Sequence, residues 1–167
     1  MLIRTATPAD VPSVLPMVAK ICALHEAWDS AKYGFLMNPE LRYEKWLSRM
    51  ASSASLEGPP QRDRNIFLVA EAENKQLVAF LVATVEREVP IYRLQEYAFI
   101  HDLWVEEEYR QAGIAKAMVM QAIEHFNSIG VKQIRLDTTV ANDAARRLFS
   151  SCGFRVSTIE MLIELNS

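Results

Sequence analysis

The stretch EEEYRQAGIAKAM, residues Glu106–Met118, decides how this chain folds. Three carboxylates lead to a single glycine, Gly113, and a helix-forming segment follows it. The first turn of a helix leaves backbone N–H groups without partners and carries about half a positive charge, which suits phosphate oxygens. Small Ala112 and Ala115 beside the glycine would let an anion approach the backbone. A glycine that only permits a tight turn explains the same residues at this point.

The loop matches neither of two well-known phosphate-binding patterns. It lacks the G-K-[ST] of a Walker P-loop and the G-x-G-x-x-G of a dinucleotide-binding fold. Arg110 and Lys116 add positive charge at its rim, and no acidic residue occurs between Arg110 and Glu124. The rest of the chain has to decide between an anion-binding loop and a plain turn.

The composition predicts one globular domain spanning residues 1–167. Half of the residues are hydrophobic and the net charge is only −3, as in an ordinary folded chain. The lack of a Lys/Arg block argues against a nucleic-acid partner, and no apolar run reaches the ~18 residues of a membrane span. Because the N-terminus has no secretory pattern, a cytoplasmic location is expected. Cys22 and Cys152 have no metal-ligand spacing, so no metal is expected.

Hydrophobic periodicity predicts a mixed sheet covered by helices. Strands are expected at 2–6, 66–72, 77–87, 97–105, 131–140 and 154–165, and helices at 8–24, 39–50, 113–129 and 142–152. The polar segment 52–65, rich in turn formers, is expected to be a mobile loop. The resulting order, β-α-α-β-β-β-α-β-α-β, indicates an α/β (α+β) fold.

Two motifs at this spacing resemble the GCN5-related N-acetyltransferase (GNAT) superfamily. RQAGIA fits the signature [Q/R]-x-x-G-x-[G/A], with Arg110, Gly113 and Ala115 in the defining places. HDLWVEEEYR resembles the strand that approaches the signature loop, and NDAARRLFSSCGF, residues 142–154, resembles the second motif of the family. The resemblance implies a mostly antiparallel sheet of about six to seven strands with about four helices. It also implies that this sheet is splayed between the strand ending near Val105 and the strand near Ile134.

The resemblance further implies that acetyl-CoA is the cosubstrate. Backbone amides of the loop would hold its pyrophosphate, and the end of the preceding strand would pair with its pantetheine arm. Asn142 and Phe149 would meet the cofactor from the other side of the splay. The implied cofactor residues are therefore Leu103, Trp104, Val105, Arg110, Gln111, Ala112, Gly113, Ile114, Ala115, Lys116, Asn142 and Phe149.

Direct acetyl transfer to an amine needs a base, a polarised carbonyl and a proton for the leaving thiolate. Glu96, His101 and Asp102 are base candidates by position, and structural roles stay open for each. Strand alternation predicts that His101 and Asp102 point to opposite faces of the sheet. The tyrosine that often serves as acid in the family falls on Phe149, so Cys152, one helical turn later, is the remaining candidate. A small buried hydrophobe is the other interpretation of Cys152.

In the family, the first two helices and their connection line the acceptor site. Here that region contains His25, Trp28 and Tyr33, whose aromatic faces suit a cationic amine. They are equally well explained as anchors of the helix end. The leading hypothesis is an N-acetyltransferase acting on a small cationic primary amine, with a peptide or protein amine as alternative. A CoA-binding sensor without turnover, and a homodimer through the strand expected at 154–165, also stay open.

Overall fold

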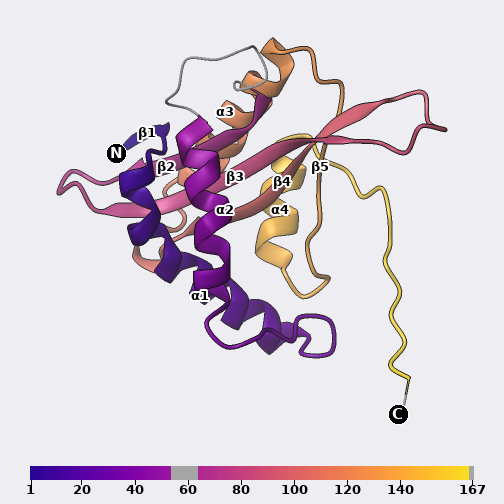
Figure 1. Cartoon of the computed structure of the whole chain (residues 1–167), viewed down its shortest axis with the longest axis horizontal. Helices are drawn as coiled ribbons and strands as arrows, with labels where there is room; N and C mark the ends of the chain where they lie inside the picture. Colours follow the sequence, from indigo (N-terminus) through magenta and orange to yellow (C-terminus); the bar gives the residue numbers. More distant parts are fainter. Residues whose placement is uncertain (54–63, 166–167) are drawn as a thin grey trace.

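The computed structural model describes residues 1–53 and 64–165, so residues 54–63 of the predicted loop lie outside the described residues. Five strands form one sheet in the order β1-β2-β3-β4-β5 (Figure 1). The first four strands are antiparallel neighbours, and β5 runs parallel to β4. The strands are β1 Leu2–Thr5, β2 Ile66–Glu71, β3 Leu77–Arg87, β4 Glu96–Val105 and β5 Ile134–Leu136.

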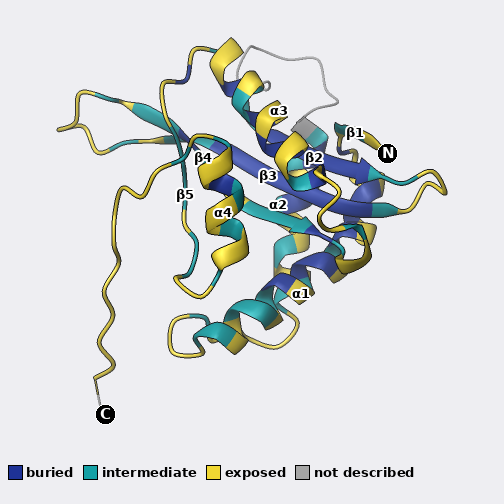
Figure 2. Cartoon of the chain, turned by 180° about the vertical axis from the view of Figure 1, so that it is seen from behind, coloured by how far each residue is buried: buried dark blue, intermediate teal, exposed yellow. Residues whose placement is uncertain are grey.

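Helices cover both faces of this sheet. One face packs on α1 (Val11–Trp28) and α2 (Pro39–Ser53), and the other on α3 (Ile114–Ser128) and α4 (Asp143–Ser151). Short 3-10 turns, η1 (Pro8–Asp10) and η3 (Glu107–Tyr109), precede α1 and α3. The centre of β3 is buried on both faces because each face has its own hydrophobic cluster (Figure 2).

Two sequence-based expectations about the sheet are wrong. The sheet has five strands rather than six or seven, and the segment 154–165, expected as a last strand, forms none. Strand β5 is also shorter than the expected 131–140. A period-2 pattern marks a chain that is able to pair, but a strand forms only where a neighbouring backbone supplies hydrogen-bond partners.

Strands β4 and β5 part soon after they meet. Their pairing joins only Ala98 to Ile134, Phe99 to Arg135 and Ile100 to Leu136, whereas β4 continues to Val105. The predicted splay therefore lies between His101–Val105 and the chain that follows β5.

A β-bulge in β4 overturns the expected alternation of His101 and Asp102. Val82 on β3 pairs with Asp102 but the next residue, Ala83, pairs with Ile100. His101 is the extra residue, and an extra residue lets two consecutive side chains share a face. Both side chains accordingly reach α2: the His101 ring lies 5.3 Å from the Trp46 ring, and Asp102 binds Tyr43.

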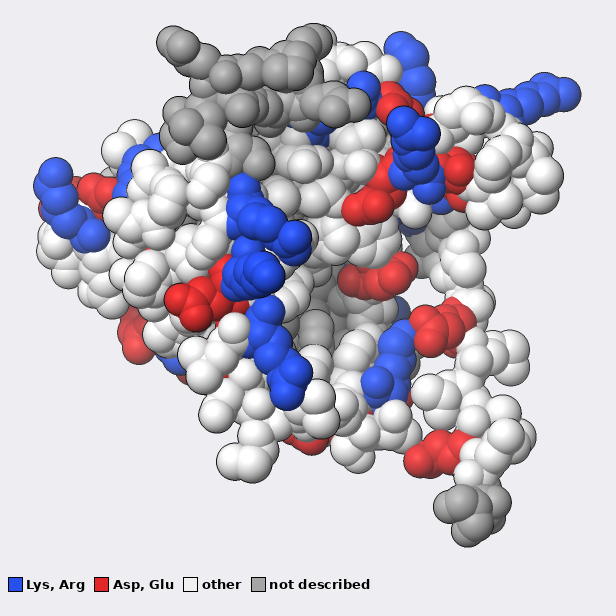
Figure 3. Space-filling model, in the orientation of Figure 1, with Lys and Arg blue, Asp and Glu red and all other residues white. Residues whose placement is uncertain are grey.

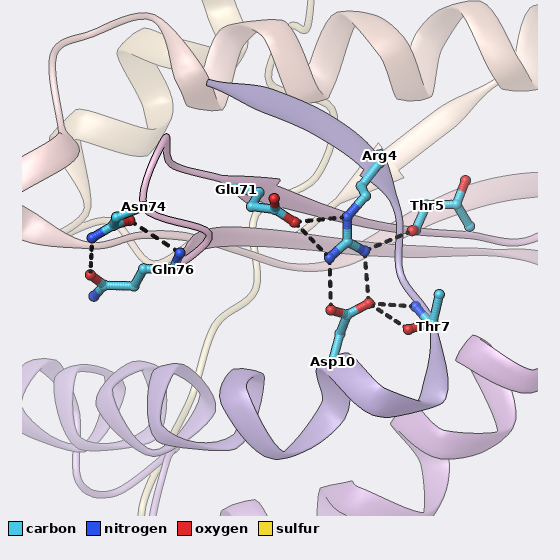
Figure 4. Close-up of polar contacts among 7 residues, drawn as sticks. All are labelled: Arg4, Thr5, Thr7, Asp10, Glu71, Asn74 and Gln76. Carbon is cyan, nitrogen blue, oxygen red and sulfur yellow. Dashed lines mark hydrogen bonds and ion pairs between the residues drawn. The ribbon is translucent and has the colours of Figure 1, made fainter.

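A partly buried charge cluster ties the N-terminus to the sheet (Figure 4). The Arg4 guanidinium donates to both oxygens of Asp10, at 2.8 and 2.9 Å, and to Glu71 Oε2 on β2 at 3.0 Å. Asp10 also accepts from the Thr7 backbone N–H at 2.7 Å, which caps the start of the helical segment. The Arg4 guanidinium lowers the pKa of Asp10 to about 2.

Replacing Asp10 with Asn is expected to destabilise the protein by about 2 kcal/mol at pH 7, because the stabilisation follows the shift of the carboxyl pKa. The folded-state pKa lies below the usual 3.8, so the stabilisation is complete above about pH 4 and disappears as pH falls through about 2. Urea denaturation of Asp10→Asn and the wild type at pH 7 and pH 2.5 measures both. The difference should shrink at the lower pH.

Lys20→Gln serves as the control for this prediction. It removes the ion pair between Lys20, which is 53% exposed, and Glu106, and exposed pairs contribute at most about 1 kcal/mol. Equal losses in the two variants, or a loss for Asp10→Asn that does not depend on pH, would contradict the role given to Asp10.

Candidate active site

The loop before α3 has a backbone suited to an anion. Gly113 is the N-cap of α3 and adopts φ 80°, ψ 0°, and Gln111 also has a positive φ of 62°. Gly113 has no side-chain oxygen to cap the helix, and the first backbone bond runs from the Ala117 N–H to Gly113 O. The N–H groups of residues 114–116 therefore have no intrahelical partner. A Cβ added at Gly113 would meet nothing within 4 Å, so the approach is open.

Arg110 ties this loop to the end of β4. Its Nε donates to the Val105 carbonyl at 2.9 Å, and its guanidinium lies 4.8 Å from the centre of the Trp104 ring. Trp104 Nε1 in turn donates to Glu106 at 3.2 Å. The side chain expected to add charge at the rim is thus also a brace between strand and loop, while Lys116 is exposed.

The open edge of β4 leads directly to this loop. Beyond Ile100, β4 keeps its pairing with β3, including Leu81 with Leu103 and Ala79 with Val105. Pairing with β5 ends at Ile100, so within the described chain the other edge of 101–105 has no strand beside it. An extended ligand arm could pair with such an edge like an added strand.

Asp102 and Tyr43 form the inner polar pair on the α2 side of β4. The Tyr43 hydroxyl donates to Asp102 Oδ2 at 2.6 Å. Burial raises the pKa of the Asp102 carboxyl, whereas the hydrogen bond from Tyr43 and the nearby His101 and His25 lower it. Burial, together with the charge of Asp102, raises the pKa of Cys22 on α1. The effect of burial is the largest, so the pKa of Asp102 is raised overall, and its carboxyl group interacts with several side chains.

His101 belongs to a second, outer network. Thr84 Oγ1 donates to Glu86 Oε1 at 2.5 Å and lies 2.6 Å from His101 Nε2. A hydroxyl donates a single hydrogen bond, and an ionised carboxylate can only accept one. Thr84 therefore donates its hydrogen bond to Glu86. Thr84 must then accept from the Nε2–H of His101. In the neutral ring this leaves the lone pair on Nδ1.

The sequence of this chain matches a known protein family over most of its length. The family model described as acetyltransferase (GNAT) family matches residues 23–154. The chain belongs to the GNAT acetyltransferase family. Members of this family acetylate amines, and acetyl-CoA is the donor that membership implies.

Named relatives and solved structures agree with this GNAT assignment. Human N-acetyltransferase 8 is 34% identical over 89 residues, covering 53% of this chain and 38% of the relative. Human N-acetyltransferase 8B is 29% identical over 142 residues, covering 85% and 59%. The chain thus spans less than two thirds of the length of these relatives.

Two crystal structures show the same fold over nearly the whole chain. A mutant BH1408 protein from Bacillus halodurans has a TM-score of 0.79 at 23% identity, covering 99% of this chain and 100% of that one. An aminoglycoside 6'-N-acetyltransferase from Acinetobacter haemolyticus has a TM-score of 0.70 at 17% identity, covering 100% and 99%. At these identities the likeness shows the fold alone.

The other predicted site residues of this GNAT chain are Glu96 on β4 and three residues in or next to α4. Glu96 pairs with Arg64 at the start of β4, about 17 Å along the strand from His101, so the structure does not bring it to the base position. Asn142 caps α4 by accepting from the Ala145 N–H at 3.1 Å. Phe149 is buried, with its ring centroid 5.5 Å from that of Phe154, and Cys152 is half-buried against the same cluster.

The predicted acceptor residues form one aromatic cluster at the end of α1. His25 stacks on Tyr33 with ring centroids 4.8 Å apart and lies 5.6 Å from Trp28. Burial lowers the pKa of His25. The neighbouring hollow, of about 270 Å³, is lined by residues of α1, of the start of α2 and of their connection: Ala19, Cys22, Ala23, Glu26, Phe35, Leu36, Met37, Asn38, Pro39 and Glu40.

Sequence reasoning missed Tyr43, Thr84 and Glu86. Thr84 and Glu86 alternate on one face of a strand that is otherwise apolar, and that pattern marks a polar spot. Nothing in the sequence around Tyr43 indicates a partner 59 residues away.

Within residues 1–53 and 64–165, no helix is long and apolar enough to cross a membrane. The same part of the chain holds no group of three or more His, Cys, Asp or Glu side chains placed to bind a metal.

Gly113→Ala is expected to weaken CoA binding about tenfold or more, because the methyl group occupies the open approach to the loop amides. Gly130→Ala is the matched control, since Gly130 at the other end of α3 has φ 81° and is equally open. Both variants should lose about 1 kcal/mol of stability through backbone strain. Calorimetric titration with CoA separates them, and equal affinity in both variants would refute the anion-binding role of the loop.

Proposed function

We propose that this chain transfers the acetyl group of acetyl-CoA directly to the primary amine of a small cationic molecule. The observation that carries the proposal is the continuity of the open β4 edge with the uncapped start of α3. The open β4 edge offers main-chain pairing to an extended arm, and the start of α3 offers unpaired amides to phosphate. CoA combines these two chemical features.

The residues present fit the cofactor. Residues Gln111–Lys116 would hold the pyrophosphate, and the edge Leu103–Val105 would hold the pantetheine arm. Asn142 already uses its side-chain oxygen to cap α4, which leaves its amide N–H groups for the cofactor. When bound, acetyl-CoA supplies a thioester carbonyl that an amine can attack.

His101 is the base that the geometry favours. It is the first residue of β4 beyond the β5 pairing, so it stands where the splay begins. Its Nδ1 lone pair can take the proton of an incoming ammonium, because Nε2–H is already committed to Thr84. Glu86, 3.6 Å from Nε2, offsets the charge that the ring then acquires. Asp102, already bound by Tyr43, contributes negative charge from the neighbouring position.

Among the described residues, the predicted positions offer no comparable donor for the proton of the leaving thiolate. Phe149 has no hydroxyl, and Cys152 packs with it against the hydrophobic cluster between the sheet and α3. A thiolate is a stable enough leaving group for transfer to proceed without strong acid assistance. In this proposal the Cys152 thiol is only a weak source of the proton for the leaving thiolate.

The acceptor region favours an amine that has both charge and apolar surface. Glu26 and Glu40 border the hollow between α1 and α2, and Phe35, Leu36 and Met37 line it with apolar groups that are 39%, 66% and 88% exposed. Cys22 lines this hollow, and burial together with the nearby charge of Asp102 raises the pKa of its thiol, so the hollow lies near Asp102. Basic side chains lie along α2 nearby (Figure 3), so the negative charge that would attract a cationic amine is confined to Glu26 and Glu40 at the hollow.

A CoA-binding sensor is the second candidate. The observation that favours it is Phe149, an apolar and buried side chain at the position where the family often has its acid. The sensor and the enzyme share the CoA site, so binding alone does not separate them.

Release of free CoA thiol from acetyl-CoA in the presence of amines is the deciding measurement. The panel contains alkylamines, polyamines, aminoglycosides and a lysine-containing peptide. We expect thiol release with the alkylamines, which carry an apolar tail, to exceed release with the other amines. CoA titration with thermal unfolding runs in parallel. Thermal stabilisation without thiol release for any amine would replace the enzyme with the sensor.

Removing the base is expected to slow transfer by about a hundredfold or more in His101→Gln, with CoA affinity unchanged. Thr84→Val should slow transfer about tenfold, whereas Thr84→Ser should keep the wild-type rate. The reason is that the hydroxyl group at this position connects Glu86 to the His101 ring by hydrogen bonds. The control His125→Gln changes a histidine on α3 and should keep full activity.

Nitrogen-15 NMR tests the relay without any turnover. The chain has three histidines, and the variants above assign them. His101 should show the tautomer with the proton on Nε2 in the wild type and in Thr84→Ser, and lose that preference in Thr84→Val. A proton on Nδ1 in the wild type would remove His101 from the base role.

A further inference from the structure

The apolar residues on both sides of the β4 bulge fix where its two polar side chains point. Those that pack in or against the hydrophobic cluster between the sheet and α3 are Ala98, Ile100, Leu103 and Val105. Side chains on one face of a strand alternate, so the step of three from Ile100 to Leu103 needs one extra residue. The packing of the core therefore places His101 and Asp102 side by side on the α2 face, independently of their own hydrogen bonds.

Three neighbours fix the orientation of the His101 ring. Its centroid lies 5.3 Å from that of Trp46 on α2 and 5.1 Å from that of Phe99 on β4, both in edge contacts. Its Nε2 lies 2.6 Å from Thr84 Oγ1 on β3. Because Nε2 is bound to Thr84, Nδ1 is the ring nitrogen that is left to meet another group.

Tyr43 holds the carboxylate that follows His101 on the same face. The Tyr43 hydroxyl donates to Asp102 Oδ2 at 2.6 Å. Burial, together with the charge of Asp102, raises the pKa of Tyr43, so the phenol keeps its proton at neutral pH and stays a donor. Tyr43 and Trp46 are three residues apart on α2 and their rings lie 4.9 Å apart. One turn of this helix therefore contacts both residues of the bulge.

The Asp102 carboxylate would need another donor if Tyr43 released it. A carboxylate that is removed from water without a hydrogen bond carries a large free-energy cost. Burial has the largest effect on the pKa of Asp102, and the nearby His101 acts in the opposite direction, so the two groups are close enough to interact. An N–H at His101 Nδ1 is a donor on the same face of the strand. Glu86 lies at the other ring nitrogen, 3.6 Å from Nε2.

We propose that Tyr43 is a positioning residue for acetyl transfer: its hydroxyl keeps the Asp102 carboxylate away from His101 Nδ1, whose lone pair then stays free for the acceptor ammonium. This inference rests on the proposed base role of His101. Without the hydroxyl, Asp102 would accept from an Nδ1–H, and the ring proton would move from Nε2 to Nδ1. The Thr84 hydroxyl would then turn from Glu86 and donate to Nε2. The number of protons stays the same, but the base loses the lone pair that it needs.

Nitrogen-15 NMR of the histidine rings in Tyr43→Phe tests the proposal without turnover. The substitution keeps the ring that packs on Trp46 and removes only the hydroxyl. We expect His101 to change from the Nε2–H to the Nδ1–H tautomer in Tyr43→Phe. The double variant Tyr43→Phe with Asp102→Asn should return to Nε2–H, because a neutral amide accepts more weakly than a carboxylate. The control Tyr97→Phe changes another half-buried tyrosine, on β4 itself, and should leave the tautomer as it is.

The kinetics should follow the tautomer. In Tyr43→Phe we expect kcat for thiol release to fall about tenfold, which is part of what a general base contributes. The KM for acetyl-CoA and the thermal stabilisation by CoA should stay at their wild-type values, because the CoA loop and the open β4 edge are unchanged. A fall in CoA affinity equal to the fall in kcat would mean that Tyr43 only supports the fold, and would overturn the positioning role.

The three histidine rings give two further outcomes that overturn the proposal. One is an unchanged His101 tautomer in Tyr43→Phe. The other is a change confined to His25, which also acts on Asp102, because the released carboxylate would then have turned to α1. Failure of the proposed function looks different: the His101 tautomer would change as expected in a protein that releases no thiol with any amine. That result would confirm the effect of Tyr43 on the ring and refute the enzyme activity.

Discussion

Strand β4 keeps its hydrogen bonds to β3 along nearly its full length but loses its neighbour on the other side after Ile100. Backbone groups rarely stay unpaired when they are enclosed, so a half-paired strand in the middle of a domain is a place for a ligand. The helix that follows supplies further unpaired amides at Gly113. The break between β4 and β5 would therefore give the proposed CoA site its length and direction, and the unpaired amides after Gly113 would give it affinity for phosphate.

The β-bulge at His101 determines which side chains meet at that break. Without the extra residue, His101 and Asp102 would point to opposite faces of the sheet and only one would reach α2. With it, two networks of different character stand side by side. Asp102 and Tyr43 form a half-buried hydrogen-bonded pair, whereas His101, Thr84 and Glu86 form a second hydrogen-bonded group, which in the proposed mechanism would accept a proton. The proposed chemistry assigns the proton transfer to the second group.

Strand β5, at the far edge of the sheet, also has backbone groups without a strand partner. β5 is held by three residue pairs to β4 and has an open outer edge, while an amphipathic tail, residues 155–165, lies exposed nearby. These three residue pairs hold β5 to β4, whereas β4 pairs with β3 along nearly its whole length.

The sequence alone determined the features that depend on neighbours along the chain. The Gly113 loop, the cap of α4 by Asn142, the hairpin of β2 and β3 and the GNAT membership were all predicted from local pattern. The tertiary structure alone decided the bulge, the relay from Glu86 on β3 to His101 on β4, the Tyr43–Asp102 pair and the unpaired tail. These depend on strand register and on contacts between residues tens of positions apart. Periodicity shows that a segment is able to pair, and only the packing of the whole chain sets which partner it finds.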